Sequence, residues 1–231
     1  QDPSSLASVK PPQDPSFSPS LKPSQDPSSI PSLKPSQDLS SVPAFRPSQV
    51  TLMSFSTCIE KYRDGEIFFC GPIEEWDVKA STNMKAAFEK MKTFNTNISE
   101  WDTYQVTDMS LMFSNANAFN ANIGTWDTSS CLAMKKMFQK SKTFNQDLSS
   151  WDVSKCTSFN SMFMKSGFNI DISDWNVYRA SDMQKMFFKS KFKQSLCWDV
   201  DRLKPKSIRK KMFQNTKGEI RCLTSSFPSL K

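Results

Sequence analysis

WDTYQVTDMSLMFSNANAFNANIGT, residues 101–125, is the stretch on which most of this chain is patterned. It recurs with a tryptophan at its start, and successive tryptophans are separated by 25, 25, 25, 24 and 23 residues. The six tryptophans are Trp76, Trp101, Trp126, Trp151, Trp175 and Trp198. A fixed period near 25 residues indicates a solenoid, in which one small unit stacks on its copies and shares their core.

Apolar residues recur at fixed positions counted from each tryptophan, chiefly at positions 8, 11, 12 and 15. Position 12 is phenylalanine in all five complete units: Phe88, Phe113, Phe138, Phe163 and Phe187. Offsets of 3, 4 and 7 place such residues on one stripe of an α-helix. Position 6 holds residues typical of a helix N-cap, namely Thr82, Thr107, Thr157 and Ser181. We therefore expect about three turns of helix per unit, with this stripe in the core and not in a cofactor site.

A second apolar position lies three residues before the next tryptophan, at Ile98, Ile123, Leu148 and Ile172. Short apolar runs stacked in one register are typical of strands in a parallel sheet. We expect one short strand per unit, opposite the helix. The asparagines that follow a phenylalanine, Asn95, Asn120, Asn145 and Asn169, are expected to form a buried ladder that bonds turn backbones, in preference to a ligand site.

Two stretches, Phe119–Phe138 and Phe144–Phe163, match the signature F-N-x-x-I-S-x-W-D-V-S-x-V-T-x-M-x-x-M-F-x-x-A almost position for position. In this the chain resembles the BspA-like class of leucine-rich-repeat surface proteins, over roughly residues 69–198. The resemblance implies an α/β, leucine-rich-repeat-like right-handed solenoid. It also implies a secreted or surface-attached protein used for adhesion and recognition, without catalysis. Cys131 and Cys156 depart from the signature, which has valine there.

The chain divides into four parts by composition and period. Residues 1–49 are rich in Pro and Ser and repeat every twelve residues, which predicts a disordered, extended stalk. Residues 50–68 predict a capping helix and turn, residues 69–198 the five-unit solenoid, and residues 199–231 a degenerate C-terminal cap and tail. Because the twelve-residue repeat is already present at residue 1, we expect a longer precursor. No apolar run approaches the ~18–20 residues of a membrane span.

The six cysteines fall into three pairs. Disulfides Cys58–Cys70 and Cys197–Cys222 would each pin an end of the solenoid, and an even number of cysteines suits an extracellular protein. Cys131 and Cys156 both occupy position 5, one unit apart, so stacking brings them within disulfide range. We favour buried free thiols at these two positions, and a bridge between them is the alternative.

The composition gives little support to catalysis or to a cofactor. The chain has no histidine, which removes the commonest general base, and only five glycines, without a phosphate-binding loop. Aspartates directly follow five of the tryptophans: Asp77, Asp102, Asp127, Asp152 and Asp199. We expect them to accept backbone N–H bonds as Asx turns do, and a row of calcium ligands is the alternative. We expect no enzyme, no cofactor and no metal.

The net charge of +7 lies outside the stalk, which is neutral. Lysines gather at positions 14 and 16, where the predicted helix would end and its dipole would favour cations. These candidate polyanion-binding residues are Lys90, Lys92, Lys140, Lys142, Lys165, Lys189 and Lys191. Recurrence at one position becomes a stripe along a solenoid, which could bind a sulfated or carboxylated polysaccharide. An ordinary solvated face is the alternative, and nucleic acid is disfavoured because the aromatic residues belong to the core.

These patterns favour an extracellular or cell-surface recognition or adhesion module whose partner is a protein or an anionic polysaccharide. Two alternatives stay open. One is a structural wall or matrix protein that holds anionic polymer without selectivity. The other is an intracellular repeat scaffold for protein–protein interaction, which would suit a chain whose end cysteines are reduced.

Overall fold

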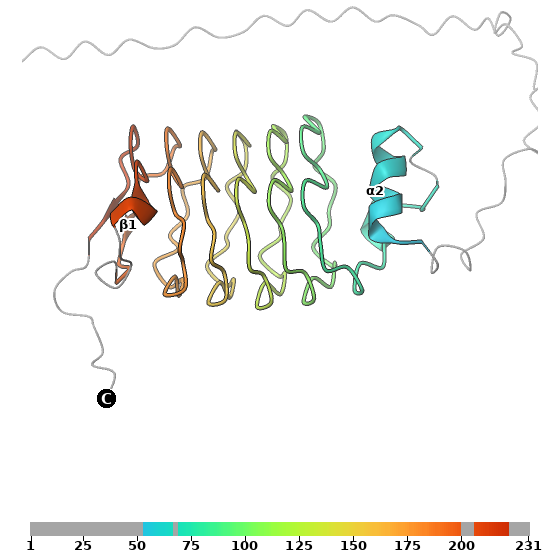
Figure 1. Ribbon diagram of the computed structural model, residues 1–231. Helices are drawn as coiled ribbons and strands as arrows, with labels where there is room; N and C mark the ends of the chain where they lie inside the picture. The colour runs from blue at the N-terminus through green and yellow to red at the C-terminus, as the bar shows by residue number, and fades with distance from the viewer. Residues whose placement is uncertain (1–52, 67–68, 200–205, 222–231) are drawn as a thin grey trace, which may run out of the picture. The chain divides into compact units, whose positions relative to one another are not determined.

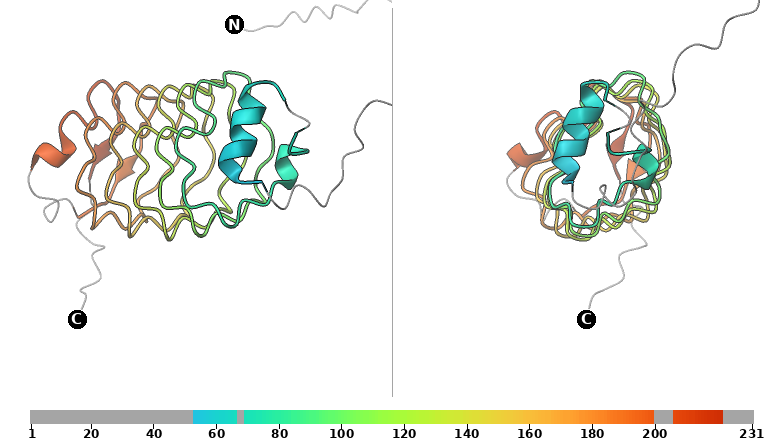
Figure 2. Two further views of the ribbon diagram at one scale, coloured as in Figure 1. Left: turned by 45° about the vertical axis from the view of Figure 1, so that its right-hand side comes forward. Right: turned by 90° about the vertical axis from the view of Figure 1, so that its right-hand side faces the viewer.

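The structure, a computed structural model, describes residues 53–66, 69–199 and 206–221, and the predicted stalk lies outside these ranges (Figure 1). Regular secondary structure is sparse among them. It consists of helix α2 (Phe55–Arg63), the 3-10 helices η2 (Ile73–Glu75) and η3 (Lys206–Arg209), and strands β1 (Ser195–Leu196) and β2 (Glu219–Ile220). Most of the described chain runs in turns that form a row of similar coils. When viewed along the row the coils superpose, and α2 lies across one end (Figure 2).

Each coil is bonded to the next by a ladder of backbone hydrogen bonds. The N–H groups at positions 8, 10, 12 and 14 donate to carbonyls one position earlier in the following coil. Between the second and third coils these bonds are Met109–Ala133 (2.9 Å), Leu111–Lys135 (2.8 Å), Phe113–Met137 (2.9 Å) and Asn115–Gln139 (2.8 Å). The same four positions are paired at all five interfaces, and parallel bridges run from Asn83 through to Asp182.

The helix predicted for each coil is wrong, because the intervening N–H groups close tight turns. Met112, Ser114 and Ala116 each donate to the carbonyl three residues earlier, at 3.2, 2.9 and 3.0 Å. The residues at positions 10 and 14 of every coil are left-handed, with φ between 56° and 65°. A left-handed residue cannot continue a right-handed helix, and it turns the neighbouring N–H groups toward the next coil.

The predicted N-caps and strands are also replaced by turns. The position-6 hydroxyls donate across coils instead of capping a helix, as Thr107 Oγ1 does to the Thr82 carbonyl at 3.0 Å. Ile98 lies in a turn closed by the Trp101 N–H at 3.3 Å, and the Asn97 side chain accepts the Ser99 N–H at 3.1 Å. Within the described ranges, named strands occur only as the short parallel pair β1–β2.

The core is a large cluster of buried aromatic and methionine side chains. The position-12 phenylalanines have 0 % exposure and form a column with ring centroids 5.3 to 5.7 Å apart from Phe88 to Phe213. A second column, from Phe94 to Phe192, stacks beside it, with Phe113 and Phe119 3.8 Å apart within one coil. Offset stacking of this kind adds about 0.5–1.5 kcal/mol per pair beyond burial.

The tryptophans lock neighbouring coils together from a third side of the core. All six are buried, with exposed fractions of 3 to 7 %. Each indole N–H donates to a backbone carbonyl, and from Trp101 onward that carbonyl belongs to a residue 26 to 28 positions earlier, about one repeat back, as for Trp151 Nε1 and the Ile123 carbonyl at 3.0 Å. A buried indole needs such a partner, since an unpaired N–H costs about 1–3 kcal/mol.

The two ends of the row are closed differently. At the first coil, α2 begins after the N-cap Ser54, whose side chain accepts the Thr57 N–H, and the predicted Cys58–Cys70 disulfide is present. At the other end the frame continues further than the sequence suggests. Met212 occupies the place of Met186 in a sixth coil, because the Phe187 N–H donates to the Met212 carbonyl at 3.0 Å. Met212 lies 14 residues after Trp198, three more than separate Met186 from Trp175, and residues 200–205 lie outside the described ranges.

We predict opposite effects of glycine at two exposed lysines. Lys165, at position 14, has φ 58°, whereas Lys135, at position 9, is not left-handed. The series Lys165→Gly, Lys165→Asn and Lys165→Val should rank Gly and Asn above wild type in the free energy of unfolding, by about 0.5–1 kcal/mol, and Val below it. Lys135→Gly should instead destabilise the protein by a similar amount. Denaturant unfolding measures both, and equal signs at the two sites would contradict the turn geometry.

Candidate functional site: a basic groove across the coils

All seven candidate lysines are exposed, and the ladder fixes how they follow one another. Lys140, Lys165 and Lys189 are adjacent along position 14, since the Lys140 N–H donates to Met164 and the Lys165 N–H to Phe188. The helix dipole expected to favour these lysines is absent, because positions 10 and 14 are left-handed turns and not helix ends. Lys189 also lies over the Phe188 ring, with Nζ 5.4 Å from its centroid.

A groove of about 680 Å³ opens beside this column and crosses the last four coils. Four lysines line it: Lys142, Lys191, Lys193 and Lys217. The remaining lining residues are neutral, and they include Thr143, Asn145, Asn169 and Thr216. No carboxylate is among the lining residues, so the groove concentrates positive charge.

Gly167 explains why the chain is hollow here. It occupies position 16 of the fourth coil, between Lys142 of the third coil and Lys191 of the fifth. A Cβ at Gly167 would lie 2.3 Å from the Lys142 carbonyl oxygen, so only glycine fits this backbone approach. The missing side chain leaves a floor of backbone with lysines on both sides.

Two asparagines of the groove are held as hydrogen-bond donors. Asn145 Oδ1 accepts the Asn169 N–H at 2.7 Å, and Asn169 Oδ1 accepts the Lys193 N–H at 2.7 Å. Because both amide oxygens are occupied by backbone N–H groups, the side-chain NH₂ groups are the free donors. Asn120 and Asn95 make equivalent bonds one and two coils before Asn145, so the predicted asparagine ladder is present, although it is half-buried or exposed and not buried.

The groove therefore gathers only part of the predicted set. Lys142 and Lys191 line it, whereas Lys90, Lys92, Lys140, Lys165 and Lys189 lie outside it. Lys217 is absent from the sequence-based set because three extra residues between Trp198 and Met212 shift it from position 16 as counted from the tryptophan. The signal that could have found it is the Phe213 ring stacked on Phe187 at 5.3 Å, which restores the frame. Among the described residues the ion pairs are Lys61–Glu66 and Arg221–Glu219, and neither involves a groove lysine.

The aspartates after tryptophan form Asx turns. The side chains of Asp77, Asp102, Asp127 and Asp152 accept the N–H two residues on, at 2.9 to 3.4 Å. Asp199 has an interaction within the structure and is not a free carboxylate. Hydrogen bonds from the Ser154 side chain and backbone lower the pKa of Asp152, and those from the Ser149 backbone and side chain lower the pKa of Asp147. The part of the chain that the structure describes contains no cluster of three or more potential metal ligands.

The described cysteines are of two kinds, those in disulfides and two buried free thiols. Cys131 and Cys156 are free thiols with 0 % exposure, as favoured from the sequence. Cys131 Sγ donates to the Ala133 carbonyl at 3.5 Å and Cys156 Sγ to the Leu132 carbonyl at 3.5 Å. Burial raises the pKa of Cys131 to about 11 and that of Cys156 to about 12. Cys197 is disulfide-bonded, and its predicted partner Cys222 lies outside the described residues.

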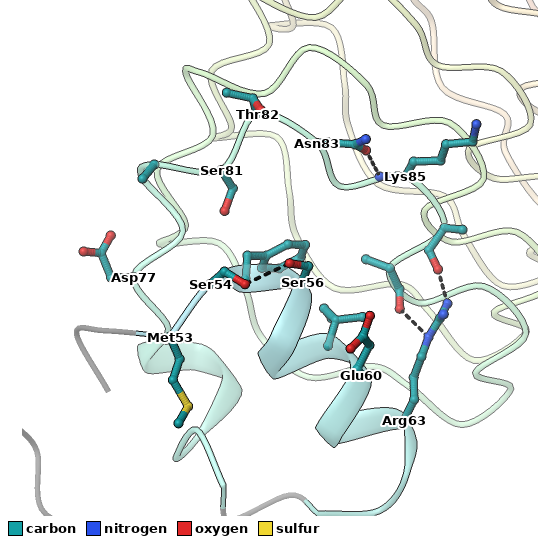
Figure 3. Close-up of a pocket in the computed structure, with 15 residues that line it drawn as sticks. Met53, Ser54, Ser56, Glu60, Arg63, Asp77, Ser81, Thr82, Asn83 and Lys85 are labelled. Atoms are coloured by element: carbon teal, nitrogen blue, oxygen red, sulfur yellow. Dashed lines mark hydrogen bonds between the residues drawn. The ribbon is translucent and has the colours of Figure 1, made fainter. Parts of the chain in front are cut away.

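A second groove, of about 760 Å³, lies between α2 and the first coil (Figure 3). It is lined by charges of both signs, Glu60 and Asp77 as well as Arg63 and Lys85. Arg63 already donates to the carbonyls of Ala86 and Ala87. This mixed lining does not select a ligand of one charge, so the basic groove is the stronger candidate for an anion.

One family model matches the chain, over residues 53–167 and 121–224, and it describes a Mycoplasma protein of unknown function, DUF285. The chain belongs to this family. The two matched stretches span the cap, all six coils and both grooves, so the DUF285 repeat is the unit seen in the structure. No curated protein and no solved structure matches the chain. Within the described ranges, no helix has the length and apolarity needed to cross a membrane.

We predict that the two free thiols make this DUF285 chain lose stability at alkaline pH. Their pKa in the folded state exceeds the ordinary value of 9.0, so above pH 9 the unfolded chain loses protons that the folded chain keeps. The free energy of unfolding should fall by about 1 kcal/mol per thiol between pH 8 and pH 10. The variant Cys131→Val/Cys156→Val, which copies Val106 at the same position, should lose less over that range.

Denaturant unfolding at each pH measures the free energy of unfolding of both proteins. The difference between them isolates the thiols, because lysines and tyrosines contribute equally to both. Parallel loss in the two proteins would contradict the burial of the thiols. As a control, iodoacetamide at pH 8 should alkylate Cys131 and Cys156 only at the rate at which the native protein opens.

Proposed function

We propose that this protein is a non-enzymatic recognition module that binds an anionic polysaccharide through the basic groove, at a cell surface or in an extracellular matrix. The observation that carries the proposal is the lining of the groove by four lysines and no carboxylate. Low-dielectric walls around charges of one sign focus the field and attract polyanions.

The hydrogen-bonding groups of the groove suit sulfate or carboxylate groups on sugars. Lysine ammonium groups and the NH₂ groups of Asn145 and Asn169 all donate. Thr143 and Thr216 hydroxyls already donate to backbone carbonyls and retain lone pairs for sugar hydroxyls. A site built almost wholly of donors favours an anion over a neutral sugar or a cation.

A polymer suits the site better than a small anion because the positive charge continues beyond the groove. Lys140, Lys165 and Lys189 follow one another on successive coils, which are spaced roughly 5 Å apart as neighbouring strands are. An extended polyanion could contact the column and the groove together, and many weak contacts would add.

Compartment and fold type belong to the same proposal. The Cys58–Cys70 disulfide supports an oxidising, extracellular environment. The 25-residue period and the resemblance to BspA-like surface proteins support a right-handed solenoid akin to leucine-rich repeats, with turns where those repeats carry helices and strands. The absence of histidine from the sequence supports a role without catalysis. A structural matrix protein that holds anionic polymer without selectivity is the second candidate, favoured by lysines that lie outside the groove.

We predict that neutralising the groove weakens binding more than neutralising the same number of lysines elsewhere. The groove variant is Lys142→Gln/Lys191→Gln/Lys193→Gln/Lys217→Gln in the full chain. The matched control, Lys79→Gln/Lys135→Gln/Lys155→Gln/Lys185→Gln, has the same net charge. At physiological salt the groove variant should lose affinity for a sulfated or carboxylated polysaccharide by about tenfold or more, since each lost ion pair is worth about 0.2–1 kcal/mol.

Equilibrium binding across a salt series measures this, with a neutral polysaccharide as the reference for charge-independent binding. Equal loss in the groove variant and its matched control would favour the unselective matrix role over the groove. Binding to none of the anionic polymers by wild-type protein would overturn the proposed function. Comparison of sulfated with carboxylated polymers decides which anion the groove prefers.

A further inference from the structure

The inter-coil ladder gives the row of coils a direction. Along positions 7 to 14 of every interface the earlier coil donates N–H groups and the later coil accepts them through carbonyls, whereas bonds elsewhere in the coil, such as that from the Thr107 N–H to the Thr82 carbonyl, run the other way. At these positions the first coil therefore has carbonyls that no earlier coil among the described residues uses, and the last coil has N–H groups that no later coil among them uses. The two ends are a row of acceptors and a row of donors of the same spacing.

At the first coil the acceptor positions are 7, 9, 11 and 13. The carbonyls of Asn83, Lys85 and Glu89 have no N–H partner among the described residues. The fourth carbonyl, that of Ala87, accepts Nε of Arg63 at 3.1 Å, and Nη2 of Arg63 donates to the adjacent Ala86 carbonyl (Figure 3). Arg63 thus takes the place that a donor from a preceding coil would occupy.

Helix α2 covers the core at the same end. Phe55 meets the rings of Trp76 and Trp101 edge-on, with centroids 6.3 and 5.7 Å apart, and Tyr62 does the same to Trp76 and Phe94. The Cys58–Cys70 disulfide ties the helix to the start of the first coil. We call α2, Arg63 and this disulfide the cap. The cap lies where the next coil of a longer row would stand.

At the sixth coil the donor row has the geometry of the other coils. Lys211 and Asn215 have φ 59° and 62°, as positions 10 and 14 do throughout, and Phe213 continues the phenylalanine column. The N–H groups of Lys211, Phe213 and Asn215 have no acceptor among the described residues. They match in spacing and register the carbonyls of Lys85, Ala87 and Glu89.

We propose that the two ends form a latent head-to-tail interface between copies of this chain, and that the cap keeps it closed. The partner is a second copy, because the sixth coil of this chain presents a donor row whose spacing and coil shape match the acceptor row of its first coil. A contact between two different ends does not close on itself, so an uncapped chain would grow into a linear filament. The inference does not depend on the proposed polysaccharide site.

The test compares full-length wild type with the uncapped variant Phe55→Ser/Cys58→Ser/Tyr62→Ser/Arg63→Ser/Cys70→Ser, which also removes the two rings that hold α2 on the first coil. Wild type should stay monomeric, whereas the average mass of the uncapped variant should rise at least about twofold with concentration, as open-ended association requires. Light scattering after gel filtration measures the mass. The double variant Cys58→Ser/Cys70→Ser, which keeps Arg63, is the control and should associate less.

Wild type itself separates specific growth from aggregation. Among the described residues nothing covers its donor row, and its acceptor end is capped, so it should bind the uncapped acceptor end and terminate growth. Adding an equimolar amount should lower the mean mass of the variant. The proposal would be overturned by a folded uncapped variant that stays monomeric. It would also be overturned if adding wild type left the mean mass of the associated variant unchanged.

A cross-link tests the register directly. Lys85 and Lys210 are exposed and both occupy position 9, in the first and sixth coils. Lys85→Cys/Lys210→Cys in the uncapped background should form disulfide-linked oligomers, while the control pair Lys85→Cys/Lys135→Cys should not. If the uncapped variant does not fold, the same cysteine pair is tested in the single variant Arg63→Ser. The absence of a specific cross-link in that protein would then overturn the proposal.

Discussion

The alternation of backbone N–H directions is the constraint on which the rest of this structure depends. Along positions 10 to 15 the N–H groups alternate, since one crosses to the following coil and the next donates to the carbonyl three residues earlier in its own coil. This alternation requires a left-handed residue at positions 10 and 14, and ten of the twelve such residues are neither glycine nor asparagine. Each costs about 1–2 kcal/mol. Four inter-coil bonds at every interface, together with the packed core, offset that cost.

The same ladder dictates the core. Because equivalent residues of adjacent coils are paired, one aromatic side chain per coil becomes a column of stacked rings, and from Trp101 onward each indole N–H reaches a carbonyl about one repeat earlier. Removing one ring would disturb the coils on either side, since its neighbours contact it on both faces. Stability is thus shared between neighbours, as in other repeat proteins. The ends are the exception, and the cap at α2 supplies there what a neighbouring coil supplies elsewhere.

The period, the core residues and the cap helix could be predicted from the sequence, because all three depend on which residues recur. The backbone conformation of each coil could not be predicted, and a helix was expected in its place because of residues such as Met109, Met112 and Phe113. Offsets of three and four bring side chains to one side in an α-helix, and they also do so in successive three-residue turns. The deciding fact is the left-handed backbone at residues such as Leu111 and Lys136, which residue preferences do not predict. Lys217 was missed for a related reason, since three extra residues between Trp198 and Met212 shift it out of the frame counted from the tryptophan.

The left-handed turns also bear on the surface. Position 14 is asparagine in the second and sixth coils and lysine in the other four. Asparagine tolerates this conformation better than lysine, so the backbone alone does not account for Lys90, Lys140, Lys165 and Lys189. Glycine at position 16 of the fourth coil, by contrast, is required by the close approach of the Lys142 carbonyl. The groove floor is therefore set by packing, whereas the lysines at position 14 adopt the left-handed conformation at a small conformational cost, as the other residues at positions 10 and 14 that are neither glycine nor asparagine do.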